Sequence, residues 1–166
     1  KYCGMRYGHQ DGDLTLKFDD YFTHFRTEYF GDEAKRRVLI GTYTRMAGFR
    51  DRYYAKSLKV RLYVIDAYKQ MLKGHDAVLA PTMPFVSPRF DEISKMSAGD
   101  HYSADYLTVP ANLAGTPHLS VPCGYDAKGL PIGMQFVTDH WDEDALVTMA
   151  MDWEKNFDVR KAGVKL

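Results

Sequence analysis

Two arginines follow two acidic residues by one helical turn near the start of the chain. Asp32 and Glu33 each precede an arginine by four positions, and those arginines are Arg36 and Arg37. Acid before base at this spacing is the favourable order for an ion pair on an exposed helix, where it contributes only about 0.2–0.5 kcal/mol. Taken alone, the spacing therefore predicts a solvated helix face.

Asp105 is a second candidate, within the segment Tyr-Ser-Ala-Asp-Tyr-Leu at residues 102–107. We expect it at the start of a short helix that ends at Gly115, because glycine suits a left-handed C-cap and Pro117 blocks a further helical turn. A carboxylate in the first turn of a helix is stabilised by the helix dipole. The simplest interpretation of Asp105 is again structural.

The other residue types that often carry chemistry form no recognisable site. The serines lack the glycine-rich surroundings of a nucleophile elbow, so we expect no catalytic residue in this chain and a structural role for Ser120. The six histidines show no ligand spacing, and we expect no metal site. Cys3 and Cys123 form no Cys-x-x-Cys motif, which favours a reducing, cytoplasmic setting, and Cys123 is expected to be a buried, inert thiol.

Composition limits the class of protein. A chain of 166 residues with 45% hydrophobic and 14% aromatic residues can form one packed domain. Its 22 basic and 22 acidic residues create no basic field, so we expect no strong direct binding of nucleic acid. No apolar run approaches the roughly 20 residues of a membrane span, and no signal-peptide pattern is present, so no membrane contact is expected.

Apolar periodicity predicts three helices in the first half of the chain. The first covers about residues 14–29, the second 32–47 with a stop at Gly48, and the third 53–73. Residues 1–12 are rich in glycine and predict a turn. Because the third helix has a wide apolar arc, we expect it to be buried against a sheet and a neighbouring helix.

The second half predicts strands at about 77–80, 118–123 and 132–138, with a turn at Lys128-Gly129 and a last helix capped by Asp142. Residues 82–102, which contain prolines and mixed charges, predict a long surface excursion with one helical turn near Ile93. This order indicates a layered α/β architecture. The chain has few strands for so many apolar helix faces, so we expect it to be an incomplete part of a larger fold.

Three motifs resemble the C-terminal half of the amidase-signature enzymes. They are Asn-Leu-Ala-Gly-Thr-Pro at 112–117, Ser-Val-Pro-Cys-Gly at 120–124 and Gly-Leu-Pro-Ile-Gly-Met-Gln-Phe at 129–136. Residues 30–42, Phe-Gly-Asp-Glu-Ala-Lys-Arg-Arg-Val-Leu-Ile-Gly-Thr, are similar to the A subunits of the glutamyl-tRNA(Gln) and aspartyl-tRNA(Asn) amidotransferases within that family. The resemblance implies a layered α/β/α fold with a mixed sheet, of which residues 1–166 form one C-terminal part without an internal boundary.

The resemblance also implies a substrate. In these A subunits a serine attacks the side-chain amide of glutamine, and the ammonia travels to a separate subunit that binds tRNA and uses ATP and Mg. Arg37 matches the arginine that binds the α-carboxylate of glutamine, and Asp105 matches the aspartate that holds its α-ammonium. A planar guanidinium meets a carboxylate through two parallel hydrogen bonds, so an arginine and an aspartate together fit a zwitterion.

The chain departs from the family in its nucleophile. Amidase-signature enzymes use a lysine and two serines in a Gly-Gly-Ser-Ser-Gly-Gly-Ser context, and nothing here matches it. The resemblance therefore implies a glutamine-recognising part that needs the remaining N-terminal part of the amidase domain and holds no cofactor itself. Two alternatives stay open, namely part of a stand-alone amide hydrolase of the same family and a non-catalytic scaffold module.

Overall fold

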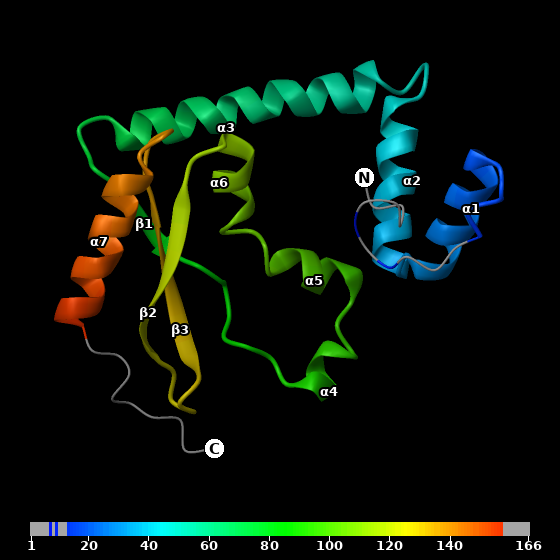
Figure 1. Ribbon diagram of the computed structural model, residues 1–166. Helices are drawn as coiled ribbons and strands as arrows, with labels where there is room; N and C mark the ends of the chain where they lie inside the picture. Colours follow the sequence, from blue (N-terminus) through cyan, green and yellow to red (C-terminus); the bar gives the residue numbers. More distant parts are fainter. Residues whose placement is uncertain (1–6, 8, 10–12, 158–166) are drawn as a thin grey trace. The chain divides into compact units, whose positions relative to one another are not determined.

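The computed structural model describes residues 7, 9 and 13–157, apart from the side chain of residue 98, and shows two compact units (Figure 1). The units are Lys1–Leu58 and Lys59–Leu166. Most of the predicted turn at residues 1–12, and with it Cys3, lies outside the described residues. The elements are α1 (Phe18–Tyr29), α2 (Asp32–Arg45), η1 (Asp51–Ala55), α3 (Lys56–Leu72), β1 (Val78–Pro81), α4 (Phe90–Ile93), α5 (Ala98–Ser103), α6 (Val109–Ala114), β2 (His118–Tyr125), β3 (Pro131–Val137) and α7 (Glu143–Asn156).

The first unit contains the helices α1 and α2. The first predicted helix begins at Phe18 instead of residue 14, because the Asp13 carboxylate accepts hydrogen bonds from the backbone N–H and the hydroxyl of Thr15 and so forms a turn. Two aromatic residues of α1, Tyr21 and Phe25, are buried. The helix α2 has no buried residue.

The segment that the sequence assigned to one helix over 53–73 begins with a π-helical turn. In η1, the backbone N–H of Ala55 donates to the carbonyl of Arg50, five residues earlier, at 2.9 Å. The helix α3 follows directly. Leu72 is the buried residue of α3, whereas Leu62 and Tyr63 are 61% and 76% exposed. The burial expected for this helix is therefore not found within the part of the chain that the structure describes.

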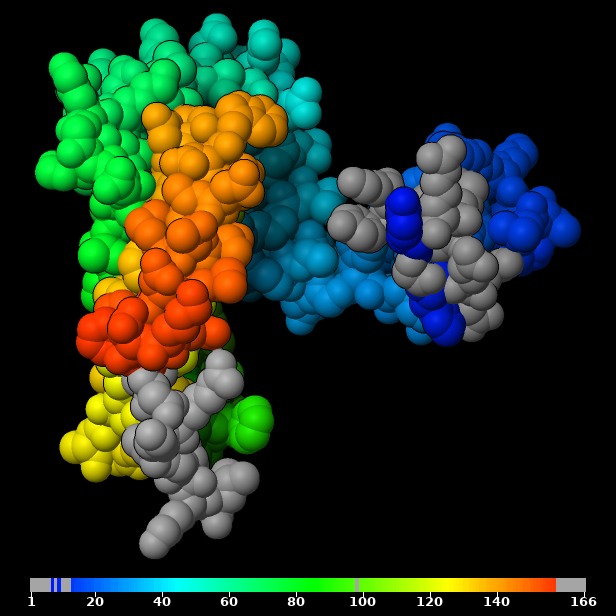
Figure 2. Space-filling view, turned by 60° about the vertical axis from the view of Figure 1, so that its left-hand side comes forward, coloured from blue at the N-terminus to red at the C-terminus, as the bar shows by residue number. Residues whose placement is uncertain are grey.

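The second unit contains a three-stranded antiparallel sheet in the order β1-β3-β2. The helix α7 packs on β2 and β3. Its residues Leu146 and Ala150 form a core with Val121 of β2 and Phe136 of β3. Figure 2 shows the yellow residues of the β2–β3 hairpin extending past the red end of α7. The mixture of helices and sheet agrees with the predicted α/β class. That residues 1–166 form one part of a domain without an internal boundary stays a prediction.

Two local predictions in the second unit, the C-cap at Gly115 and the turn at Lys128-Gly129, are confirmed. Gly115 ends α6 with a φ of +80°, which is the left-handed C-cap that the sequence predicts. In the β2–β3 turn, the Asp126 carboxylate accepts from the N–H groups of Lys128 and Leu130, both at 2.8 Å. Asp142 takes the N-cap position of α7, although its side chain makes no capping bond.

Candidate functional site

Arg37 lies on α2 in the ion pair that its spacing predicts. Its Nε donates to Oε1 of Glu33 at 2.8 Å, and Nη1 of Arg36 donates to Oε2 of the same carboxylate, also at 2.8 Å. The side chains of Arg37 and Arg36 are 61% and 50% exposed. One glutamate thus orients both guanidinium groups at the protein surface.

Arg37 also lines an open hollow of about 510 Å³ on α2. The lining of this Arg37 hollow is Arg37, Val38, Gly41, Thr42, Arg45 and Met46, and contains two guanidinium groups and no acidic side chain. Arg45 lies two helical turns after Arg37, with its guanidinium 5.6 Å from the centre of the Tyr54 ring. Arg45 belongs to none of the sequence motifs above, although its spacing of eight residues from Arg37 is a usable signal. Two positive charges in one hollow suit an anionic ligand such as a carboxylate.

Asp105 lies in the turn between α5 and α6, not in the first turn of a helix as predicted. Its backbone carbonyl accepts from the N–H of Val109 at 2.9 Å and that of Thr108 at 3.1 Å. The helix starts at Val109 because Pro110 suits a first-turn position, where its missing N–H would have no partner inside the helix. Asp105 is exposed, so its carboxylate is accessible to a ligand.

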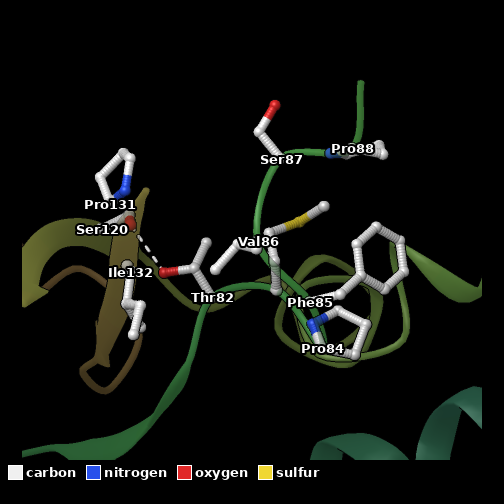
Figure 3. Close-up of a pocket in the computed structure, with 11 residues that line it drawn as sticks. Thr82, Pro84, Phe85, Val86, Ser87, Pro88, Ser120, Pro131 and Ile132 are labelled. Carbon is white, nitrogen blue, oxygen red and sulfur yellow. Dashed lines mark hydrogen bonds between the residues drawn. The ribbon is translucent and has the colours of Figure 1, made fainter. Parts of the chain in front are cut away.

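A groove of about 530 Å³ lies beside the end of β1 in the same unit (Figure 3). We call it the Thr82 groove, and its lining is Thr82, Met83, Pro84, Phe85, Val86, Ser87, Pro88, Ser120, Pro131, Ile132 and Gly133. The hydroxyls of Thr82 and Ser120 are 2.6 Å apart in one hydrogen bond, and a Cβ on Gly133 would come within 3.0 Å of both oxygens. The lining consists of apolar side chains, Gly133 and the hydroxyl-bearing residues Thr82, Ser87 and Ser120.

Gln135 joins the Thr82 groove to the turn that carries Asp105. It is 1% exposed on the central strand β3, and its Nε2 donates to the carbonyls of Pro81 and Leu107. Pro81 directly precedes the groove residue Thr82, and Leu107 is two residues after Asp105. In the sequence, Gln135 is recognisable only as part of a family motif, because a single glutamine in an apolar strand gives no sign of its partners.

The predicted burial of Cys123 is wrong. The thiol is exposed, because an irregularity in β2 between Pro122 and Gly124 breaks the regular alternation of side chains there. In the described parts of the chain, no group of three or more His, Cys, Asp or Glu side chains could hold a metal ion. Across residues 13–157 no helix combines the length and the apolar character needed to cross a membrane.

Arg37 and Asp105 belong to different compact units, and the contacts given above for each residue lie within its own unit. The Arg37 hollow can receive a carboxylate through guanidinium hydrogen bonds. Asp105 can accept hydrogen bonds from a cationic group such as an ammonium. The charges of the two residues are therefore opposite, and each suits a different ionised group.

Comparison with known proteins finds relatives along nearly the whole chain. The chain is 39% identical to the A subunit of the glutamyl-tRNA(Gln) amidotransferase of Clostridium botulinum (strain Kyoto / Type A2) over 161 residues, which are 97% of this chain and 33% of that protein. Identity to the same subunit of Clostridium novyi (strain NT) is also 39%, over 98% of this chain and 33% of the relative. The chain thus spans about a third of the length of the curated relatives that it matches.

Similar solved structures agree with these sequence matches. The A subunit of the glutamyl-tRNA(Gln) amidotransferase of Thermotoga maritima aligns with a TM-score of 0.61 at 35% identity, over 83% of this chain and 30% of that one. A crystal structure described only as that of an amidase aligns with a TM-score of 0.62 at 23% identity over 83% of this chain and 32% of its own, and supports the fold alone. These alignments confirm the predicted partial α/β fold. The model of the Amidase family matches residues 3–147, and the chain therefore belongs to the Amidase family.

Proposed function

We propose that this chain is the C-terminal portion of the glutaminase (A) subunit of a tRNA-dependent amidotransferase. The observation that carries the proposal is the 39% identity to the A subunit of the glutamyl-tRNA(Gln) amidotransferase over 97% of the chain. In this proposal the whole enzyme releases ammonia from glutamine in the cytoplasm and uses it to amidate Glu-tRNA(Gln) or Asp-tRNA(Asn). The portion described here recognises glutamine and contributes no nucleophile.

Two side chains are proposed to bind the substrate. The guanidinium of Arg37, in a hollow that also contains Arg45, meets the α-carboxylate of glutamine. Because a guanidinium offers five N–H donors in a planar fork, it can form two parallel bonds with a ligand while it keeps its ion pair with Glu33. The exposed carboxylate of Asp105 accepts hydrogen bonds from the α-ammonium.

The proposal assigns the remaining chemistry to other polypeptide segments. The N-terminal part of the amidase domain would supply the lysine and two serines that hydrolyse the side-chain amide. A partner subunit would bind tRNA and use ATP and Mg, so that this chain needs no cofactor. We therefore expect the chain alone to be inactive.

A hybrid protein tests the proposal. This chain replaces the matching third of the A subunit from Clostridium botulinum. Glutamate release from glutamine is then measured for this hybrid and for the isolated chain. Activity in the hybrid but not in the isolated chain supports a substrate-binding portion that needs its catalytic complement. Activity of the isolated chain would show a nucleophile that the proposal excludes. A hybrid that hydrolyses a simple amide such as butyramide but shows no preference for glutamine would favour a stand-alone amide hydrolase.

A further inference from the structure

Gln135 is a buried polar residue on the central strand of the sheet. It is 1% exposed and lies on β3 opposite Ala80 of β1 and Ser120 of β2. Burying a carboxamide costs free energy unless its polar atoms find hydrogen-bond partners. The hydrogen-bond partners of Gln135 therefore indicate why a carboxamide occupies this position.

The nitrogen of this carboxamide joins two segments that are distant in sequence. Nε2 donates to the carbonyl oxygen of Leu107 at 2.8 Å and to that of Pro81 at 3.1 Å. Leu107 belongs to the turn that carries Asp105, and Pro81 is the last residue of β1. One side chain thus fixes that turn against the end of a strand.

The orientation of the carboxamide follows from its partners. Both are carbonyl oxygens, which only accept hydrogen bonds, so the amide nitrogen must face them. Oε1 then points the other way, and this buried oxygen accepts no hydrogen bond from any residue that the structure describes. An apolar side chain of similar length would fill the same space without burying that oxygen. The two donated hydrogen bonds are therefore what a glutamine adds at this position.

The other hydrogen bonds of the turn are local. The N–H groups of Thr108 and Val109 donate to the carbonyl of Asp105, and the side-chain amide of Asn112 donates to the carbonyl of Thr108. These bonds set the shape of the turn and not its place in the unit. For the described residues 104–108, the hydrogen bond from Gln135 is the one that reaches the sheet.

We propose that Gln135 is a positioning residue for substrate binding, which holds the turn carrying Asp105 against the end of β1 so that the carboxylate meets the α-ammonium of glutamine. This inference rests on the proposed function. Gln135 itself touches no substrate and acts through Asp105. Because Pro81 leads directly into Thr82, the same side chain also fixes the turn relative to the Thr82 groove.

The first test is Gln135→Met in the hybrid protein, since methionine is similar in length and has no donor. The matched control is Asn156→Met, at an exposed carboxamide side chain on α7. Loss of the two hydrogen bonds should lower kcat/KM for glutamine about 10-fold, mainly through KM. Hydrolysis of butyramide, which has no ammonium group, should stay at the parent level. Equal losses on both substrates would reveal a purely structural role and overturn the proposal.

A double-mutant cycle tests whether Gln135 acts through Asp105. Once Asp105→Asn has removed the charge, adding Gln135→Met should cause no further loss of kcat/KM for glutamine. Independent, additive losses would contradict positioning. If Gln135→Met does not fold, Gln135→Asn takes its place, because its amide is one methylene shorter and cannot span both carbonyls.

A readout without turnover separates this inference from the proposed function. Hydrogen exchange is measured on this chain itself at the backbone amides of Thr108 and Val109. Both amides should exchange faster in Gln135→Met than in the parent and in Asn156→Met. Faster exchange with no glutaminase activity in the parent hybrid would refute the proposed function and leave the anchoring intact. Unchanged exchange would overturn the anchoring itself.

Discussion

At the residue scale, the carboxylate of Glu33 pairs with both Arg36 and Arg37, at 2.8 Å in each case, and the two arginines are adjacent on the same turn of α2. This makes Arg36 a control for Arg37. If both serve only the helix, either Arg→Ala change should affect activity equally and weakly, because exposed helix ion pairs contribute little. If Arg37 binds the α-carboxylate, Arg37→Ala alone should lower kcat/KM for glutamine by about 10- to 150-fold. Steady-state kinetics of the Arg36→Ala and Arg37→Ala hybrids distinguish the two roles. Equal kcat/KM values for glutamine in the two variants would refute the assignment of Arg37.

Asp105 is expected to discriminate by charge. Asp105→Asn keeps the size of the side chain and one acceptor oxygen but removes its negative charge. It should lower kcat/KM for glutamine by about 10- to 150-fold, because the bond to a cationic ammonium is charge-assisted. Hydrolysis of butyramide should be unaffected. Asp152→Asn, at an exposed position on α7, is the control, and a similar loss there would make the effect of Asp105 unspecific.

The stability of α5, the helix that precedes the turn carrying Asp105, should depend on pH through the carboxylate of Asp100. Hydrogen bonds from the hydroxyl and then the backbone N–H of Ser97 lower the pKa of Asp100 below its ordinary value. A carboxyl group with a lowered pKa in the folded state stabilises that state above its pKa in the unfolded chain, and the effect is lost as the pH falls through the folded value. The start of α5 should therefore loosen only below the ordinary pKa of aspartate, about 3.9.

An NMR titration of the Asp100 carboxyl group checks this prediction. Ser97→Ala removes the hydroxyl donor and should move the pKa of Asp100 upward. Asp139, whose pKa is lowered by hydrogen bonds from the backbone N–H and the ring of His140, serves as the reference and should titrate unchanged in the same variant. An unchanged Asp100 titration would show that the hydroxyl does not hold this carboxylate in solution.

At the element scale, Gly115 is the residue that stops α6 before β2. Its φ of +80° disfavours any residue with a Cβ, whereas the space around it is adequate, since an added Cβ would meet Nε2 of His140 at 3.9 Å. Gly115→Ala should therefore destabilise the protein by about 1–2 kcal/mol through backbone strain alone. Gly99→Ala within α5 should be neutral or stabilising, because alanine is the better helix former. Urea unfolding of both variants measures the difference, and two equal changes would contradict the strain argument.

The elements that the sequence predicted well are those with local causes. Gly115 and the hairpin turn around Asp126 and Gly129 are set by neighbours within a few residues, so their conformations follow from residue type. No pattern in the sequence predicts the π-helical turn η1, and only the structure shows the hydrogen bond from the N–H of Ala55 to the carbonyl of Arg50, five residues earlier. The contacts of Gln135 join segments 28 and 54 residues away, which no local pattern contains. Arg37 and Asp105 were selected through family resemblance, because spacing alone favoured structural roles for both.

At the scale of the whole molecule, long apolar side chains remain exposed on several helices. On α2, Leu39 is 70% exposed, and on α3, Leu62 is 61% and Tyr63 is 76% exposed. Soluble proteins seldom leave contiguous apolar patches uncovered unless another surface binds there. The chain spans about a third of its curated relatives, so the rest of an amidase domain is the occupant that we expect for these faces.

This expectation distinguishes a portion of an enzyme from a self-sufficient scaffold. If the apolar faces of α2 and α3 are covered by the rest of the domain, the isolated chain should bind the dye ANS and self-associate. The hybrid protein, which contains the other two thirds of the Clostridium botulinum subunit, should bind much less dye per chain. Leu62→Lys provides the control for the surface itself, because it should reduce dye binding by the isolated chain but destabilise the hybrid, where the same position would be buried next to an apolar partner. An isolated chain that is monomeric, binds no dye and tolerates the lysine equally in both contexts would instead be a complete scaffold module, and the glutaminase proposal would lose its structural basis.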